Sequence, residues 1–166
     1  MAADQPISYG GQGFSFAGLN RRLTLPLQMR KLITESSGKT KMMFVAKHDR
    51  WPCLIGYGRS YIHQFSAMLD RQEELANARG QAFDRDMRAM QLHSFMEVPF
   101  DSSGRFVLPE AWVKLSSVDD RIFFQGNGDF ITLWAPKALY AMGPGFEAVQ
   151  AVCAALEAEA EKARKG

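Results

Sequence analysis

Cysteine is scarce in this sequence and long apolar runs are missing, and each shortage excludes a class of protein. The two cysteines, Cys53 and Cys153, are a hundred positions apart and form no C-x-x-C pair. Such usage argues against a disulfide framework or a zinc ribbon and fits a reducing compartment. No window approaches the ~18 consecutive apolar residues of a membrane span, and the first residues lack the basic and apolar regions of a secretory signal. We therefore expect a cytoplasmic protein without a membrane partner, built as one domain or as two small halves that share a core.

An excess of charge of one sign is also missing. The chain has 20 Lys and Arg residues against 18 Asp and Glu residues, a formal net charge of +2, so any basic surface must come from local placement. The glycine-rich start of the chain, GGQGFSF from Gly10, leads into a strand-like segment. A phosphate-binding loop needs a strand before it and a helix after it. We therefore exclude a nucleotide site and expect residues 1–13 to form a mobile N-terminal arm.

Recognised catalytic and metal-binding spacings are absent as well. His48, Asp49 and Cys53 lie close together in the sequence, and His63 and His93 flank the helical middle segment. None of these residues has a ligand spacing such as H-E-x-x-H, and His48 falls in a segment that reads as a polar turn. We therefore predict no enzyme activity, no metal, no cofactor and no small-molecule substrate.

One short stretch, DSSGRFVLP at 101–109, carries the most informative local pattern. Asp101 can open a turn through side-chain to backbone hydrogen bonds, Gly104 can take a positive φ, and residues 106–108 read as a strand. Arg105 then lies at the junction of turn and strand and faces solvent. It either contacts a partner or pairs with Asp101 as an ordinary surface arginine.

A weaker copy of this stretch lies 83 positions earlier. LNRRLTLPLQMRKL at 19–32 aligns with SSGRFVLPEAWVKL at 102–115, and five of fourteen positions are identical where chance gives about one. With a shift of 79, residues 42–57 align with 121–136. The identical pairs of the first alignment are Arg22/Arg105, Leu25/Leu108, Pro26/Pro109, Lys31/Lys114 and Leu32/Leu115. The chain therefore contains a duplicated unit.

In each half, the residue pattern predicts a strand, a short helix that begins with proline, a second strand, a polar turn and a third strand. Pro26 and Pro109 suit the first turn of a helix, because the missing N–H costs nothing there. The later strands are expected at 42–45 and 51–57 in the first half and at 122–124 and 130–134 in the second. Two such units are each too small to bury their own sheet, so they should pair into one barrel about a pseudo-twofold axis.

Helical periodicity marks the middle and the end of the chain. Apolar residues recur with period 3.6 between residues 60 and 96, and a break at Gly80 predicts two helices. After Pro144 an apolar stripe predicts a terminal helix that packs on its own barrel or on a neighbouring subunit. The stripe consists of Phe146, Val149, Val152, Cys153 and Leu156.

The motif DSSGRFVLP, its weaker copy GLNRRLTLP and the helical segment between them resemble the MraZ family over roughly residues 9–140. Members of that family are bacterial regulators built from two tandem repeats of the SpoVT-AbrB type. The resemblance implies an α+β, β-rich fold: a swapped-hairpin AbrB-type barrel with linker helices and a C-terminal helix. The expected parts are an arm at 1–13, a first repeat at 14–59, a helical linker at 60–96, a second repeat at 97–140 and a C-terminal helix or tail at 141–166.

The resemblance also implies a function. Family members assemble into rings and bind short direct repeats in double-stranded DNA upstream of the division and cell wall gene cluster, usually as repressors. We therefore expect a nucleoid-associated homo-oligomer that regulates transcription. The motif arginines contact DNA in the family, and they fall on Arg105 in the second repeat and on Arg22 in the first. An arginine on a turn can pair with a phosphate or with the edge of guanine.

The first motif departs from the family pattern. Gly18 stands where the family has Asp, Asn20 where Lys is usual, and Arg21 where the turn glycine belongs. Because arginine is poorly suited to positive φ, we expect a different turn there, with Asn20 or Gly18 in the left-handed conformation. Arg21 adds a third candidate DNA contact. Further cations can extend a basic surface or form solvated faces, namely Lys31, Lys39, Lys41, Lys47 and Arg50.

The degenerate first motif and the modest net charge keep a second function open. In this alternative the chain is an oligomeric scaffold of the AbrB fold, or an antitoxin-like protein, that acts through protein contacts while its DNA binding is weakened. Salt-dependent binding to duplex DNA distinguishes the two functions.

Overall fold

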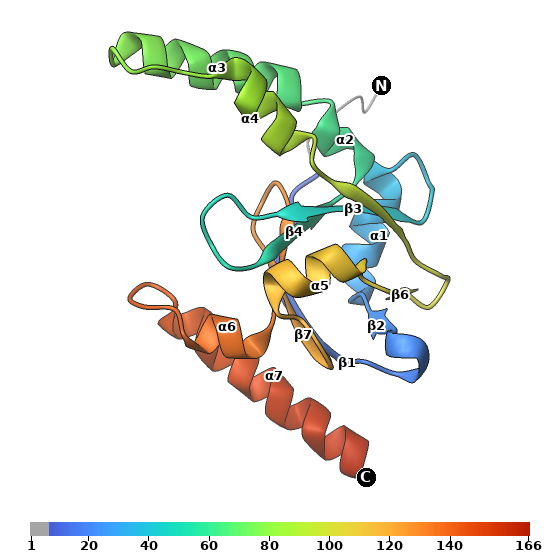
Figure 1. The fold of residues 1–166 in the computed structure, drawn as a ribbon. Helices are drawn as coiled ribbons and strands as arrows, with labels where there is room; N and C mark the ends of the chain where they lie inside the picture. The colour runs from blue at the N-terminus through green and yellow to red at the C-terminus, as the bar shows by residue number, and fades with distance from the viewer. Residues whose placement is uncertain (1–6) are drawn as a thin grey trace.

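The computed structural model describes residues 7–166, and its main feature is an antiparallel sheet of six strands (Figure 1). The strands stand in the order β1-β7-β8-β4-β3-β5. Two further strands, β2 (Leu23–Thr24) and β6 (Arg105–Phe106), form a separate antiparallel ribbon. The bounds of the sheet strands are β1 (Gln12–Phe16), β3 (Met42–Lys47), β4 (Leu54–Tyr57), β5 (Met96–Pro99), β7 (Arg121–Gly126) and β8 (Ile131–Trp134).

Seven α-helices accompany these strands in the described part of the chain, which confirms the α+β, β-rich fold class. Pro26 and Pro109 precede the helices α1 (Leu27–Ser36) and α5 (Glu110–Ser116), in agreement with the helix starts expected from the prolines. The other helices are α2 (Arg59–Ile62), α3 (Phe65–Ala78), α4 (Arg85–Leu92), α6 (Pro136–Tyr140) and α7 (Glu147–Lys165).

The two halves of the chain exchange their first strands. β1 pairs with β7, where Phe14 lies opposite Phe123, and β5 pairs with β3, where Glu97 lies opposite Phe44. The hairpins β3–β4 and β7–β8 meet in the middle of the sheet through β4 and β8. A closed barrel was expected, and that expectation is wrong. The sheet is open, because β1 and β5 stand at opposite ends of the strand order and the short ribbon does not join them.

The core beneath the ribbon is built by apolar residues that alternate with the motif arginines. Leu25 and Leu108 are buried with Met29 and Ile33 of α1, and Trp112 of α5 joins the same cluster. Burial of a large apolar side chain stabilises a fold by roughly 1.5–3 kcal/mol. The strands that carry Arg22 and Arg105 are therefore fixed to the core by their inner faces.

The helical segment between the halves contains three helices where two were expected. The turn of α2 is followed by α3, and Gly80, with φ of 65°, lies between α3 and α4 near the expected break. Arg88 of α4 forms two hydrogen bonds to the carboxylate of Asp49, at 3.0 and 2.9 Å, and thereby ties the hairpin of α3 and α4 to the turn after β3. The far end of this hairpin projects away from the sheet (Figure 1).

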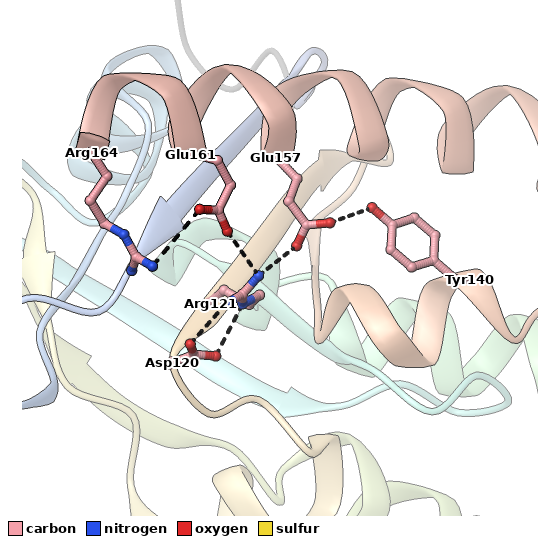
Figure 2. Close-up of polar contacts among 6 residues, drawn as sticks. All are labelled: Asp120, Arg121, Tyr140, Glu157, Glu161 and Arg164. Atoms are coloured by element: carbon pink, nitrogen blue, oxygen red, sulfur yellow. Dashed lines mark hydrogen bonds and ion pairs between the residues drawn. The ribbon is translucent and has the colours of Figure 1, made fainter. Parts of the chain in front are cut away.

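The C-terminal helix α7 packs on the chain's own sheet, which is one of the two alternatives raised by its apolar stripe. Cys153 is buried among Phe123, Trp134 and Leu139, and α7 lies against β1. Figure 2 shows the polar contacts beside this packing. Arg121 of β7 binds Asp120, Glu157 at 3.2 Å and Glu161 at 3.5 Å, while the Tyr140 hydroxyl donates to Glu157 at 2.9 Å.

The described end of the chain, residues 7–13, differs from the mobile arm that was expected. Tyr9 is buried, exchanges backbone hydrogen bonds with Gly128 at 2.8 and 2.9 Å, and accepts the backbone N–H of Gly58 on its hydroxyl at 3.1 Å. Its large apolar ring and its paired hydroxyl explain this order. The rest of the expected arm, residues 1–6, lies outside the described residues.

Candidate nucleic-acid interface

The ribbon of β2 and β6 has one apolar face and one polar face. Leu23 lies opposite Phe106, and Thr24 lies opposite Arg105. Because successive side chains of a strand point to opposite sides, the residues alternate between buried and exposed. The buried ones are Leu23, Leu25, Phe106 and Leu108, and the exposed ones are Arg22, Thr24, Arg105 and Val107. We call these four exposed residues the outer face of the ribbon, and it carries both motif arginines.

The turn before β6 is shaped by Asp101 and Gly104. Asp101 Oδ1 accepts the backbone N–H groups of Ser103 and Arg105, each at 2.9 Å. Gly104 has φ of 83°, and its carbonyl accepts the N–H of Leu25 at 2.9 Å. A Cβ at Gly104 would lie 2.9 Å from the Leu25 carbonyl oxygen. Glycine is therefore required at this position by both the conformation and the space.

Arg105 makes a second contact with Asp101. Its Nε–H donates to Asp101 Oδ2 at 2.8 Å, and the arginine side chain stays 49% exposed. The backbone N–H of Arg105, followed by its side-chain hydrogen bond, keeps the pKa of the Asp101 carboxyl below its ordinary value. The pairing expected of an ordinary surface arginine is thus present, and it also orients the guanidinium on the outer face. Only Nε of this guanidinium is engaged among residues 7–166.

The turn before β2 closes differently. The N–H of Gly18 donates to the Arg22 carbonyl at 2.8 Å, and the N–H of Arg22 donates to the Leu19 carbonyl at 3.3 Å. Asn20 takes φ of 57°, as one of the two expected options, whereas Gly18 has φ of −92°. Arg21 also takes a positive φ, 60°, which contradicts the expectation that arginine would avoid the glycine conformation. Two consecutive left-handed residues other than glycine each store backbone strain.

A groove beside the turn at 101–105 brings together three cations, of which Arg30 was not among the candidates from the sequence. It encloses about 440 Å³, and its lining includes Arg30 and Lys31 of α1, Lys41 and Ser102, together with the carboxylates of Glu35 and Asp101 and the apolar side chains of Leu27 and Phe100. Arg30 Nη1 donates to the Ser102 carbonyl and Lys41 Nζ donates to the Ser102 hydroxyl, each at 3.1 Å. Arg30 is one helical turn after Pro26, so the position of the helix start is the signal that could have identified it.

The other cations of the first half do not gather at this groove. Lys47 Nζ donates to the carbonyls of His48 and Trp51, Lys39 takes φ of 65° just after α1, and the Arg50 guanidinium lies 5.6 Å from the Trp51 ring centroid. These contacts belong to local turns. Of the five cations considered from the sequence, Lys31 and Lys41 are the ones that line the groove.

The residues that suggested an enzyme have structural contacts instead. Cys53 is fully buried, and burial raises the pKa of its thiol to about 12, which leaves no thiolate nucleophile near neutral pH. His48 Nδ1 accepts the backbone N–H groups of Arg50 and Trp51 at 3.1 and 3.0 Å. Within residues 7–166 no group of three or more potential metal ligands comes together, and no helix is both long and apolar enough to cross a membrane.

Comparisons with known proteins give one consistent name. No family model matches the chain. The protein named transcriptional regulator MraZ in Parvibaculum lavamentivorans is 30% identical over 133 residues, which are 75% of this chain and 78% of the relative. The protein of the same name in Rhodospirillum rubrum is 27% identical over 128 residues, 72% and 74% of the two chains. A third, from Phenylobacterium zucineum, is 23% identical over 121 residues, 73% and 71% of the two chains. The chain belongs to the MraZ family.

Proposed function

We propose that this protein is a DNA-binding transcriptional regulator and that the outer face of the β2–β6 ribbon reads the DNA. The main observation in support of the proposal is the position of Arg22 and Arg105 in the structure. Both lie on the exposed face of one two-stranded ribbon whose other face is anchored in the core. The relatives, each named a transcriptional regulator, support the same function.

The dimensions of DNA suit such a ribbon. The major groove of B-DNA admits a two-stranded β-ribbon, and arginine binds the O6 and N7 atoms of guanine with two hydrogen bonds. Arg105 is held by Asp101 through Nε, so its terminal nitrogens are available for that pairing. Arg22 belongs to a turn with no carboxylate at the position equivalent to Asp101, because Gly18 occupies it. We propose Arg105 and Arg22 as the base-reading residues.

Cations on both sides of the ribbon support contacts with the DNA backbone. Arg21 lies in the turn before β2, and Arg30 and Lys41 lie beside the turn before β6. Phosphate contacts position a protein on the duplex and carry little sequence information. We assign this role to Arg21, Arg30 and Lys41.

A single ribbon contacts few base pairs, so specific binding requires several copies. We propose that the chain assembles into a homo-oligomeric ring that binds direct repeats in the promoter of the division and cell wall gene cluster and represses transcription there. Linked binding events raise the overall affinity without any new contact. Such a protein works in the cytoplasm, in association with the nucleoid.

The proposal is tested by titrating labelled duplex DNA with the full chain. The probe is the region upstream of the protein's own gene, and anisotropy is read at about 50 and about 200 mM salt, over which phosphate contacts produce a steep loss of affinity. Arg105→Ala should weaken binding about 10- to 100-fold, the usual value of one bidentate base contact. Arg22→Ala should act in the same direction, while Arg30→Ala should mainly reduce the salt dependence, by about one unit of slope.

The matched control is Arg71→Ala, an exposed arginine of α3 remote from the ribbon. It should bind as the native protein does, and all variants should keep the native oligomeric mass in light scattering. Absence of salt-dependent binding in the native protein, or an Arg105→Ala variant with native affinity, would contradict the proposal. The first result would instead favour the scaffold or antitoxin-like alternative.

A further inference from the structure

Two apolar side chains are exposed at the end of the ribbon that carries Arg22. Leu19, in the turn before β2, is 88% exposed, more than any other large hydrophobic residue in the described chain. Val107 follows β6 on the outer face and is 49% exposed. Since Leu23 lies opposite Phe106, the same register sets Val107 opposite Arg22. Both side chains are therefore available to a partner that docks on the outer face.

Two arginines lie near these side chains, Arg21 in the same turn as Leu19 and Arg22 opposite Val107. Arg21 and Val107 line the same shallow depression, together with the carboxylate residue Asp119. Arg22 is tied to Leu19 by its backbone N–H. A purely apolar protein surface docked here would remove the guanidinium group of Arg22 from water without supplying a counter-charge, which is costly. Duplex DNA supplies phosphates for the arginines and, in the major groove, one apolar group at its base edges, the C5-methyl of thymine.

The opposite end of the ribbon differs at the aligned positions, although Leu27, which is 56% exposed, lines the groove there. The residue aligned with Leu19 is Ser102, whose hydroxyl and carbonyl accept hydrogen bonds from Lys41 and Arg30. The residue aligned with Val107 is Thr24. At the aligned positions the two ends of the ribbon therefore offer different groups to a duplex: the hydroxyl groups of Ser102 and Thr24 at one end, and the aliphatic side chains of Leu19 and Val107 at the other.

We infer that Leu19 and Val107 contact the C5-methyl group of thymine and make this end of the ribbon select thymine at its place in the bound sequence. The inference rests on the proposed function, because it requires the outer face to lie in the major groove. Arg21 and Arg22 hold the turn against the duplex. The two aliphatic side chains bury the C5-methyl group of thymine, and this burial distinguishes thymine from bases that lack the group. Cytosine has no such methyl group and offers a hydrogen-bond donor at the adjacent position, so it would be disfavoured.

Deoxyuridine tests this contact directly, because it differs from thymidine only by the missing C5-methyl group. The tightest duplex is first selected from a random-sequence pool with the full chain, and each thymine is then replaced singly by deoxyuridine. At one or more thymines the native protein should lose about fourfold in affinity, the effect of withdrawing one methyl group from an apolar contact. In Leu19→Ser or Val107→Ala the same replacement should have little further effect. The control Leu75→Ser, at an exposed leucine of α3, should keep the native sensitivity.

The possible failures are distinguishable. If no duplex is enriched by the native protein, the proposed function itself fails, and the inference with it. If a duplex is bound but every deoxyuridine replacement is neutral, or if the loss is the same in the variants as in the native protein, the inference alone is overturned. If Leu19→Ser and Val107→Ala instead lower the oligomeric mass while the deoxyuridine effect persists, these side chains belong to a contact between subunits, and thymine selection is excluded for them.

Discussion

Asp101 binds Arg105 at two points, accepting its backbone N–H on Oδ1 at 2.9 Å and its Nε–H on Oδ2 at 2.8 Å. One carboxylate thus closes the turn and fixes the direction of the guanidinium. Gly18 occupies the equivalent position before β2, and Arg22 has no carboxylate at that position. The outer face therefore carries one arginine fixed by its turn and one that its turn does not fix. Because Asp101 already holds the Arg105 side chain in place, less conformational entropy is lost when Arg105 binds DNA. The side chain of Arg22 can adapt to the duplex.

Asp101→Asn separates the two functions of this carboxylate. The amide oxygen can still accept the backbone N–H groups of Ser103 and Arg105, so the turn should persist, whereas the part of the stability that depends on the ionised carboxylate should be lost at pH 7. In the native protein the pKa of Asp101 is lowered by folding. Its stabilising effect is therefore full above the unfolded pKa near 3.8 and is lost as the pH falls through the folded value. Thermal unfolding between pH 7 and pH 3 should show a shallower acid dependence for the variant, and parallel curves would contradict this account.

Gly104→Ala should destabilise the protein more than Gly128→Ala does. The two glycines have nearly equal positive φ, 83° and 81°, so both substitutions impose strain of about 1–2 kcal/mol. At Gly128 a Cβ meets nothing within 4 Å, whereas at Gly104 it lies 2.9 Å from the Leu25 carbonyl oxygen. The difference between the two unfolding free energies, measured by chemical denaturation, isolates this contact. Equal losses would show that the backbone around Leu25 relaxes.

The local parts of this fold can be predicted from sequence, and the non-local pairings cannot. Pro26 and Pro109 mark the helix starts because their effect on the backbone acts within one turn. The short strand β5, which lies almost entirely in the expected second repeat at 97–140, was not predicted as a strand, since four residues ending in Pro99 give little alternation to detect. The open sheet depends on which distant strands pair, and no local pattern encodes that choice. The residues of the candidate site were predicted, but their common outer face and the groove at Arg30 depend on the register of two strands 82 positions apart.

Two buried tyrosines differ in whether the hydroxyl group has a hydrogen-bond partner, and this difference can be tested. The Tyr9 hydroxyl accepts the N–H of Gly58 at 3.1 Å, whereas the buried Tyr57 hydroxyl has no partner among the described residues. Tyr9→Phe leaves a buried N–H without an acceptor and should cost about 1–3 kcal/mol of unfolding free energy. Tyr57→Phe removes a hydroxyl that burial already penalises, so it should be neutral or stabilising. Equal losses in the two variants would indicate a buried water bound to Tyr57.

His48 should make the folded protein sensitive to mild acid. The residue is buried, and burial lowers its pKa. The charge of Asp49 acts in the opposite direction, and the charges of Lys47 and Arg50 add to the lowering. The unfolded chain takes up a proton near pH 6.5, the ordinary value, while the folded chain resists protonation. The unfolded state therefore binds more protons in this range, and the free energy of unfolding should fall as the pH drops below that value.

His48→Asn places an amide oxygen near the position of Nδ1, where it can still accept the N–H groups of Arg50 and Trp51, and it removes the titrating group. Denaturation at pH 8, 7, 6 and 5 should show a flatter profile for His48→Asn than for the native protein. If His48→Asn and the native protein lose stability in parallel, the acid sensitivity arises elsewhere in the chain.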